Sequence, residues 1–96
     1  MLIDGHPPTS AWVAHPDVAW VEGEGRVALL DLRRPGLQVQ VCPEPAASLW
    51  RLMGETVVSE AELLQRARGL VGDGAEALVD ATLCAFSAAG LIERRP

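Results

Sequence analysis

Short apolar runs separated by turn residues fill positions 18–42. The runs are VAWVE, RVALLDL and LQVQVC, and the segments between them contain the glycines and the proline expected of tight turns. Apolar runs joined by such short turns are typical of antiparallel hairpins. The pattern therefore predicts three antiparallel strands in chain order. The uninterrupted run from Val27 to Leu30 indicates that the middle strand is the most deeply buried.

The last predicted strand, 37–42, has a regular two-residue period. One face carries Leu37, Val39 and Val41, and the other carries Gln38, Gln40 and Cys42. Because successive side chains of a strand point to opposite sides of the sheet, this period is typical of a strand with one buried face. As the last strand of the meander, it is also expected to form an open edge of the sheet.

After residue 43 the apolar period changes to that of helices. Helices are predicted over residues 45–54, 59–69 and 75–89. The first is expected to end at Gly54 and to place Trp50 in the core. Ser59 and Glu62 have the spacing of a capping box, which marks the start of the second helix.

Residues 1–17 show no sustained period and contain three prolines and both histidines. Proline disfavours helix at its own position and at the residue before it. We therefore expect an extended N-terminal arm over 1–17 and a single domain over 18–96. Strands followed by helices predict an α+β fold. The expected fold is winged helix-turn-helix-like, with a three-stranded antiparallel sheet followed by three helices.

Acidic residues outnumber basic ones in this 96-residue chain, at 13 against 8, which gives a net charge of −5. Affinity for a nucleic-acid backbone comes from Lys and Arg, and no cation lies between Asp73 and Glu93 on the third predicted helix. We therefore expect no nucleic-acid partner. The apolar stretches are far shorter than the roughly 20 residues that span a bilayer. A cytoplasmic protein without a membrane partner is expected.

The residues that carry catalysis in enzymes are poorly placed for it here. Both histidines fall in the predicted arm, and the carboxylates are scattered over positions expected to be exposed. Catalysis requires an activated nucleophile, a metal or an acid–base pair held in a concave site. Cys42 and Cys84 have neither CxxC nor Cys/His spacing suited to zinc. We expect no enzymatic activity, no metal and no cofactor.

Peptide binding is the function class that the pattern favours. An open strand edge presents unpaired N–H and C=O groups, to which an extended peptide can add as a further strand. The strand at 37–42 is the expected edge. The third predicted helix has a wide apolar surface for its length, which packing of a small core can also explain; it is formed by Leu78, Val79, Leu83, Phe86 and the alanines at 81, 85, 88 and 89.

Three stretches in order carry a family resemblance: GRVALLD at 25–31, AASLWRLMG at 46–54 and AAGLIE at 88–93. With the strand and helix order, they make the chain resemble the PqqD-like proteins over residues 18–95. These are small precursor-recognition domains, called RiPP recognition elements, in pathways that make ribosomally synthesised and post-translationally modified peptides (RiPPs). With VALLD in its middle strand, the chain looks most similar to the PqqD-like proteins of the lasso-peptide branch.

The resemblance implies a non-catalytic accessory protein of RiPP biosynthesis. The leader region of a precursor peptide would add to the sheet as an antiparallel strand, and the domain would present it to a leader peptidase or a radical-SAM enzyme. The implied peptide-binding residues are the strand residues Leu37, Gln38, Val39, Gln40 and Val41, with the helix residues Val79, Leu83 and Phe86. The alternative is a winged-helix protein with a regulatory or scaffolding role.

Overall fold

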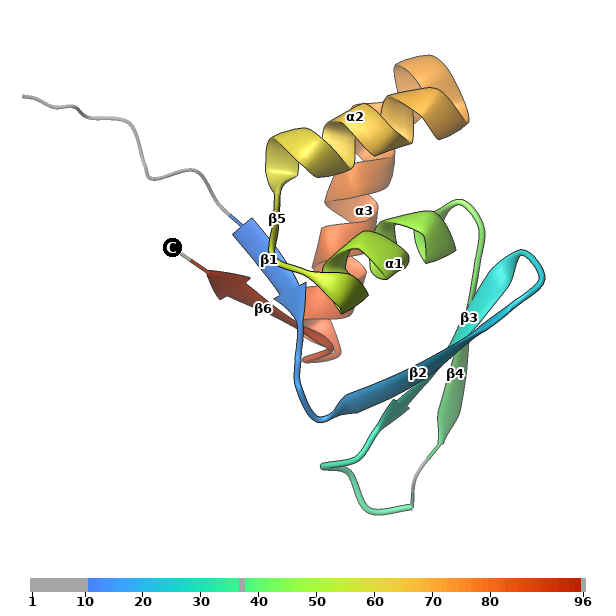
Figure 1. Ribbon diagram of the computed structural model, residues 1–96, viewed down its shortest axis with the longest axis vertical. Helices are drawn as coiled ribbons and strands as arrows, with labels where there is room; N and C mark the ends of the chain where they lie inside the picture. The colour runs from blue at the N-terminus through green and yellow to red at the C-terminus, as the bar shows by residue number, and fades with distance from the viewer. Residues whose placement is uncertain (1–10, 37, 96) are drawn as a thin grey trace, which may run out of the picture.

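A three-stranded antiparallel sheet forms one side of the molecule (Figure 1). The computed structural model describes residues 11–36 and 38–95. Its first hairpin joins β2 (Val18–Gly23) to β3 (Arg26–Asp31), and a longer loop leads to β4 (Val39–Pro43). The strand order is β2-β3-β4, with Trp20 opposite Leu29 and Leu29 opposite Gln40. The α+β class and this antiparallel sheet are confirmed.

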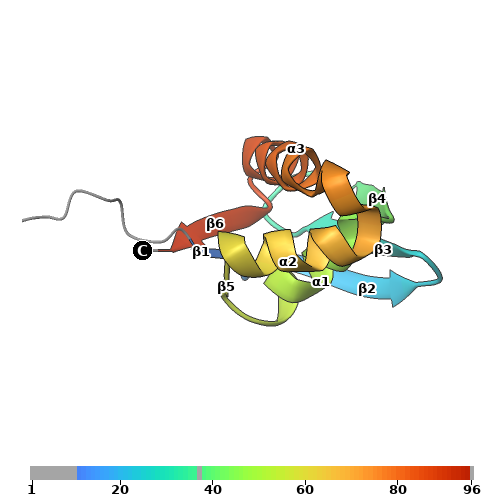
Figure 2. The same ribbon diagram turned by 90° about the horizontal axis from the view of Figure 1, so that it is seen from above.

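The helices follow the sheet along the chain. They are α1 (Ala46–Glu55), α2 (Glu60–Val71) and α3 (Ala75–Ala88), with a short 3-10 turn η1 (Gly72–Gly74) before α3. The Ser59 side chain accepts a hydrogen bond from the Glu62 amide, and the Glu62 carboxylate accepts one from the Ser59 amide. This capping box starts α2 at the expected position. Helices α2 and α3 are in contact, and Figure 1 and Figure 2 together show that they cross rather than run parallel.

A second antiparallel sheet was not expected from the sequence. It is built from β1 (Ala11–Ala14), β5 (Val58–Ser59) and β6 (Ile92–Arg95), in the order β5-β1-β6. Residues 11–14 of the predicted arm are extended, but they pair with the C-terminal strand as part of the folded structure. Strands of two to four residues from distant parts of the chain leave no local hairpin signal. Residues 1–10 lie outside the described part.

The core lies between the helices and the inward face of the β2-β3-β4 sheet. Trp50 from α1 is fully buried at its centre, as predicted. It makes edge-to-face contacts with Trp20 from β2, at a centroid distance of 6.3 Å, and with Phe86 from α3, at 5.3 Å. Rings at these distances attract through their quadrupoles. Trp50 therefore joins the sheet to α3.

Gly54 lies within the last turn of α1, and the prediction that it ends the helix was wrong. The Trp20 ring packs directly on it. A Cβ atom at this position would lie 2.7 Å from Trp20 Cζ2, which is too close for two carbon atoms. Gly54 is thus required by the close approach of β2 to α1.

Candidate functional site

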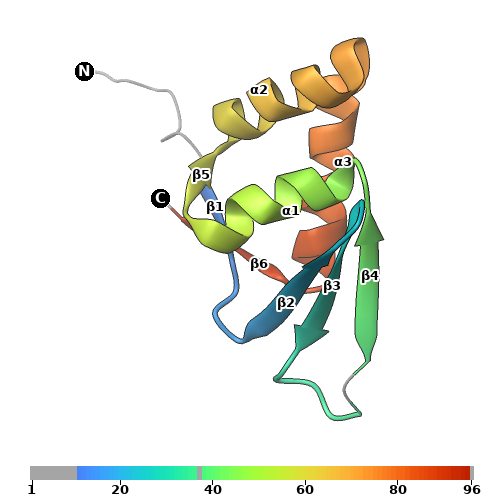
Figure 3. The same cartoon turned by 45° about the vertical axis from the view of Figure 1, so that its right-hand side comes forward.

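Strand β4 forms an edge of its sheet (Figure 3). Within the described residues it pairs only with β3, so its other side has no strand partner. The side chains alternate, but the buried face is not the one expected from the sequence. Val39 and Val41 are 62% and 61% exposed on the outward face, whereas Cys42 is 9% exposed on the inward face.

The reason for this reversal is the position of the helices. The described helices pack on the inward face of the sheet, where Val27, Leu29 and Cys42 join the core. No described helix covers the outward face, so Val39 and Val41 stay accessible. Gln40 points inward but remains exposed, because it faces a hollow rather than the core.

An apolar hollow of about 290 Å³ lies between β4 and α3. Strand β4 lines it with Gln40, Val41, Cys42 and Pro43, and α3 lines it with Ala81, Thr82, Ala85 and Phe86. The side chains of Ala81 and Ala85 lie one helical turn apart and end at a methyl group. Alanine at these positions leaves the space beside β4 open, where a longer side chain would fill it.

A polar hollow of about 450 Å³ continues the depression toward the end of α3. Its walls come from the β3–β4 loop, from β4 and from the last turn of α3, and they are formed by Asp31, Arg34, Pro35, Gly36, Gln38, Gln40, Ala88 and Ala89. Gln40 lines both hollows. We therefore treat them as one groove along the open edge of β4, and call it the β4–α3 groove.

Asp31 and two arginines fix the polar end of the β4–α3 groove. Arg33 Nε and Nη2 donate to the two Asp31 oxygens at 2.9 Å each, and Arg34 Nε donates to Oδ2 at 3.1 Å. The hydrogen bonds from Arg33 hold the pKa of the Asp31 carboxyl well below its usual value, with a smaller contribution from Arg34. Asp31 is therefore ionised across the physiological pH range.

The same arginines bind the C-terminal end of α3. Arg33 Nη2 donates to the carbonyl oxygen of Gly90 at 2.6 Å, and Arg34 Nη2 donates to that of Ala89 at 3.0 Å. Carbonyl groups at a helix C-terminus lack partners in the helix and favour cations. Asp31, Arg33 and Arg34 thus tie the β3–β4 loop to α3 and set the width of the groove at this end.

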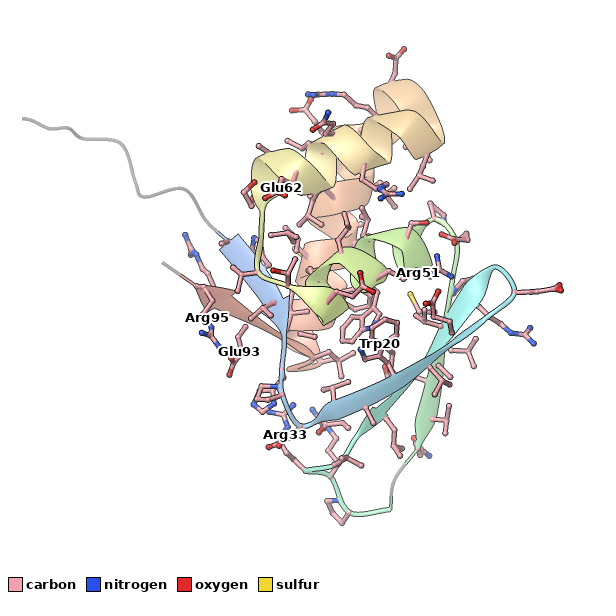
Figure 4. The ribbon with its side chains drawn as sticks, in the orientation of Figure 1. Trp20, Arg33, Arg51, Glu62, Glu93 and Arg95 are labelled. Carbon is pink, nitrogen blue, oxygen red and sulfur yellow. The ribbon has the colours of Figure 1, made fainter. Side chains whose placement is uncertain are left out.

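A second ion-pair network lies at the opposite end of the sheet, around Arg51 (Figure 4). Arg51 Nε donates to Glu22 on β2, and Nη1 donates to Glu44 just after β4, both at 2.7 Å. Glu44 also accepts hydrogen bonds from the Ser48 amide and hydroxyl. The bond from Arg51, with help from Ser48, lowers the pKa of Glu44. This network holds the start of α1 against both edge strands.

The structure brings together only some of the residues implied by the resemblance. Gln38, Gln40, Val41 and Phe86 line the β4–α3 groove, and Val39 is exposed on the same strand. Val79 and Leu83 are 1% and 6% exposed in the core cluster, and they are absent from both hollows. They pack in the core and hold α3 in place. Leu37 lies outside the described residues.

Arg34 and the alanines of the third helix were not among the peptide-binding residues expected from the sequence. The alanines at 81, 85 and 88 recur at helical spacing, which could have marked a shallow face of α3. Nothing local in the sequence indicates that Arg34 reaches Ala89, because the two residues are 55 positions apart.

The described residues show neither a metal-binding cluster nor a membrane-spanning helix. Within residues 11–36 and 38–95, no three His, Cys, Asp or Glu residues are grouped so that they could hold a metal ion. None of the helices described there has the length and apolar character needed to cross a bilayer. His15 accepts a hydrogen bond from the Asp17 amide and lies 3.6 Å from Glu93, and neither His15 nor Glu93 lines the β4–α3 groove.

Comparisons with known proteins do not assign the chain to a family. No family model matches it, and no match was found among curated proteins or solved structures. The resemblance to PqqD-like proteins therefore stays a prediction from the sequence, and the functional argument depends on the β4–α3 groove.

Proposed function

We propose that the chain is a non-catalytic accessory protein of RiPP biosynthesis that binds the leader region of a precursor peptide by β-strand addition. The observation that carries the proposal is the open edge of β4 beside a groove lined by α3. Strand addition needs both features, because main-chain hydrogen bonds supply affinity and the adjacent hollow accepts side chains.

The main chain of β4 is suited to an antiparallel partner. In antiparallel sheets, successive residues of an edge strand alternate between bonding the inner neighbour and turning their N–H and C=O groups outward. Strand β4 therefore offers outward groups at every second residue of Val39–Pro43, except that Pro43 has no N–H to donate. Every second side chain of an added peptide would enter the β4–α3 groove, and the others would lie on the outward face next to Val39 and Val41.

The other edge of the sheet is a poorer site for a peptide. Trp20 on β2 packs against α1, and Glu22 on β2 binds Arg51. The inward side of β2 is therefore occupied by side chains of the domain itself. A hollow of about 220 Å³ does border β2, but it is smaller than either hollow of the β4–α3 groove and strand residues alone line it. A peptide that needs side-chain pockets is better served by β4.

The finer description of the fold belongs to this proposal. In a winged helix-turn-helix domain of the PqqD-like type, β2, β3 and β4 would form the peptide-binding sheet, and α3 would form the wall of the cleft. The peptide-loaded domain then presents the precursor to a leader peptidase, as in lasso-peptide pathways, or to a radical-SAM enzyme. The outward face that carries Val39 and Val41 is accessible for such an encounter.

Filling the apolar hollow tests the proposal. Ala85 is exposed and lines the hollow, so Ala85→Leu should fold normally and occupy the space that a leader side chain needs. Ser87→Leu is the matched control, because Ser87 is also exposed on α3 but lies on a different face of the helix and outside both hollows.

The probes are the fluorescein-labelled N-terminal segments of the peptides encoded by short open reading frames next to this chain's gene, each titrated by fluorescence anisotropy. We expect Ala85→Leu to weaken binding at least about tenfold, or about 1.4 kcal/mol, and Ser87→Leu to bind like the wild type. Equal affinity in all three folded proteins, or no binding by the wild type, would contradict the proposed site. Circular dichroism checks that each variant is folded.

A further inference from the structure

The two ends of the β4–α3 groove differ in chemistry. No charged residue lines the apolar hollow, and its helix wall consists of Ala81, Thr82, Ala85 and Phe86. The polar hollow is lined instead by Arg34, Asp31 and two glutamine side chains. A peptide lying along β4 would meet both environments in turn.

Arg34 gives the polar hollow an exposed donor to which no described protein group is bonded. Its Nε and Nη2 atoms bind Asp31 and the Ala89 carbonyl, and within the described residues no hydrogen bond engages Nη1. The Arg34 side chain is 62% exposed. A guanidinium carries five N–H donors and no acceptor, so an acidic side chain is its natural partner.

The acidic residues nearby do not satisfy this donor. Both Asp31 oxygens already accept hydrogen bonds from Arg33 and Arg34. Arg33 is more fully engaged than Arg34, because its guanidinium donates to both Asp31 oxygens and to the Gly90 carbonyl, and its side chain is 36% exposed, against 62% for Arg34. Arg34 therefore supplies the positive charge available to a ligand at this end, in a chain whose net charge is −5.

The direction of β4 determines which hollow the earlier residues of a bound peptide would occupy. Strand β4 runs from Val39, at the polar end, to Pro43, at the apolar end. An antiparallel partner runs the opposite way, so its residues would occupy the apolar hollow first and the polar hollow afterwards. The peptide side chain in the apolar hollow and the one in the polar hollow must point to the same face of the peptide strand. Because successive side chains alternate between faces, the two residues must be an even number of positions apart.

We propose that the groove selects an extended peptide in which an apolar side chain is followed, two or four residues later, by Asp or Glu. This inference rests on the proposed function, since it specifies the peptide that β4 would bind. Gln38 lines the polar hollow and Cys42 lines the apolar hollow, and the four residues from one to the other span about 13 Å of extended chain. A separation of two or four residues fits that length.

Selection from a random library tests the inference without knowledge of the natural precursor. Short random peptides displayed on their encoding nucleic acid are selected on the full 96-residue chain, and the recovered sequences are aligned. We expect an apolar residue followed by Asp or Glu at an even spacing. Selection on Ala85→Leu should lose the apolar preference.

Three variants then test the polar end. Arg34→Gln should weaken a selected acidic peptide at least about tenfold, and it should leave the same peptide with Gln in place of the acid unchanged. Arg34→Lys keeps the charge and should retain the acidic preference in part. Because Arg34 also binds α3, Gln38→Glu serves as a second variant: it adds a negative charge to the same hollow at an exposed position and should disfavour acidic peptides.

The outcomes separate this inference from the proposed function. The inference would be overturned if binding of the selected peptides is lost in Ala85→Leu but the peptides show no preference for Asp or Glu, or carry the acidic residue before the apolar one. Strand addition at β4 would then remain supported. An acidic preference unchanged by Gln38→Glu and Arg34→Gln would also overturn it. Failure of the wild type to enrich any peptide would contradict both.

Discussion

The two edge strands of the β2-β3-β4 sheet differ in what their inward side chains contact. On β2, Trp20 packs against Trp50 and Gly54 of α1, and Glu22 is bound by Arg51. On β4, Cys42 is buried, but Gln40 faces the groove beside α3. One edge is closed by the domain's own side chains, and the other is left open.

This difference shows that an unpaired strand edge alone does not define a binding site. Both edges present free main-chain groups, since each pairs with β3 on one side only within the described residues. Only the β4 edge lies beside both hollows of the groove, which could hold alternate side chains of an added strand. The closed edge stabilises the fold, and the open edge is the one that we propose for binding.

Trp50→Ala should have the largest effect, because it removes the ring that joins the closed edge to α3. Truncation of a buried aromatic side chain costs roughly 3–5 kcal/mol. That is a large fraction of the stability of a domain of this size. Urea denaturation followed by circular dichroism measures the change. An unchanged midpoint would mean that Trp50 does not support the closed edge.

Gly54→Ala tests the closed edge by overpacking. The new methyl group would meet the Trp20 ring at 2.7 Å, and overpacking of this kind costs roughly 1–3 kcal/mol. The gain in helix propensity offsets about 1 kcal/mol of this cost, so a lower denaturation midpoint is expected.

Gly69→Ala is the matched control in α2, because no atom lies within 4 Å of the added Cβ. It should raise the free energy of unfolding by up to about 1 kcal/mol. A gain in stability from both alanine substitutions would contradict the close contact between Trp20 and α1.

Acid should weaken the link between the open edge and the end of α3. The pKa of Asp31 is lowered in the folded protein, from a usual value of 3.8, chiefly by hydrogen bonds from Arg33. Its contribution is therefore complete above that usual value and declines as the pH falls through the folded pKa. Asp31→Asn should lower stability at neutral pH and reduce its dependence on pH below about 5, measured by urea denaturation at several pH values. An identical pH profile in the variant would exclude this role.

The sequence predicted those parts of the fold that leave a local signal. The turn residues between the apolar runs predicted the β2-β3-β4 sheet. The Ser59–Glu62 spacing predicted the start of α2, and the apolar residues around Trp50 predicted that it lies in the core. The sheet made by β1, β5 and β6 was missed, since its pairing joins residues as distant as Trp12 and Arg94.

The candidate site was predicted less completely than the fold. The period of β4 was recognised, but its buried face was assigned the wrong way round, because periodicity does not say which face the helices cover. The resemblance implied that Val79 and Leu83 line the groove, but these apolar side chains pack in the core. Arg34 belongs to the groove through a contact that only the folded structure creates.

An N-methylation scan of the bound peptide tests strand addition at β4 most directly. Replacing one peptide N–H at a time with N–CH₃ removes a single main-chain donor and leaves every side chain in place. The account predicts that affinity falls at alternate peptide positions and is nearly unchanged at the positions between them, because only every second N–H of an antiparallel strand faces its partner. Losses that follow the side chains without this two-residue period would contradict the proposal.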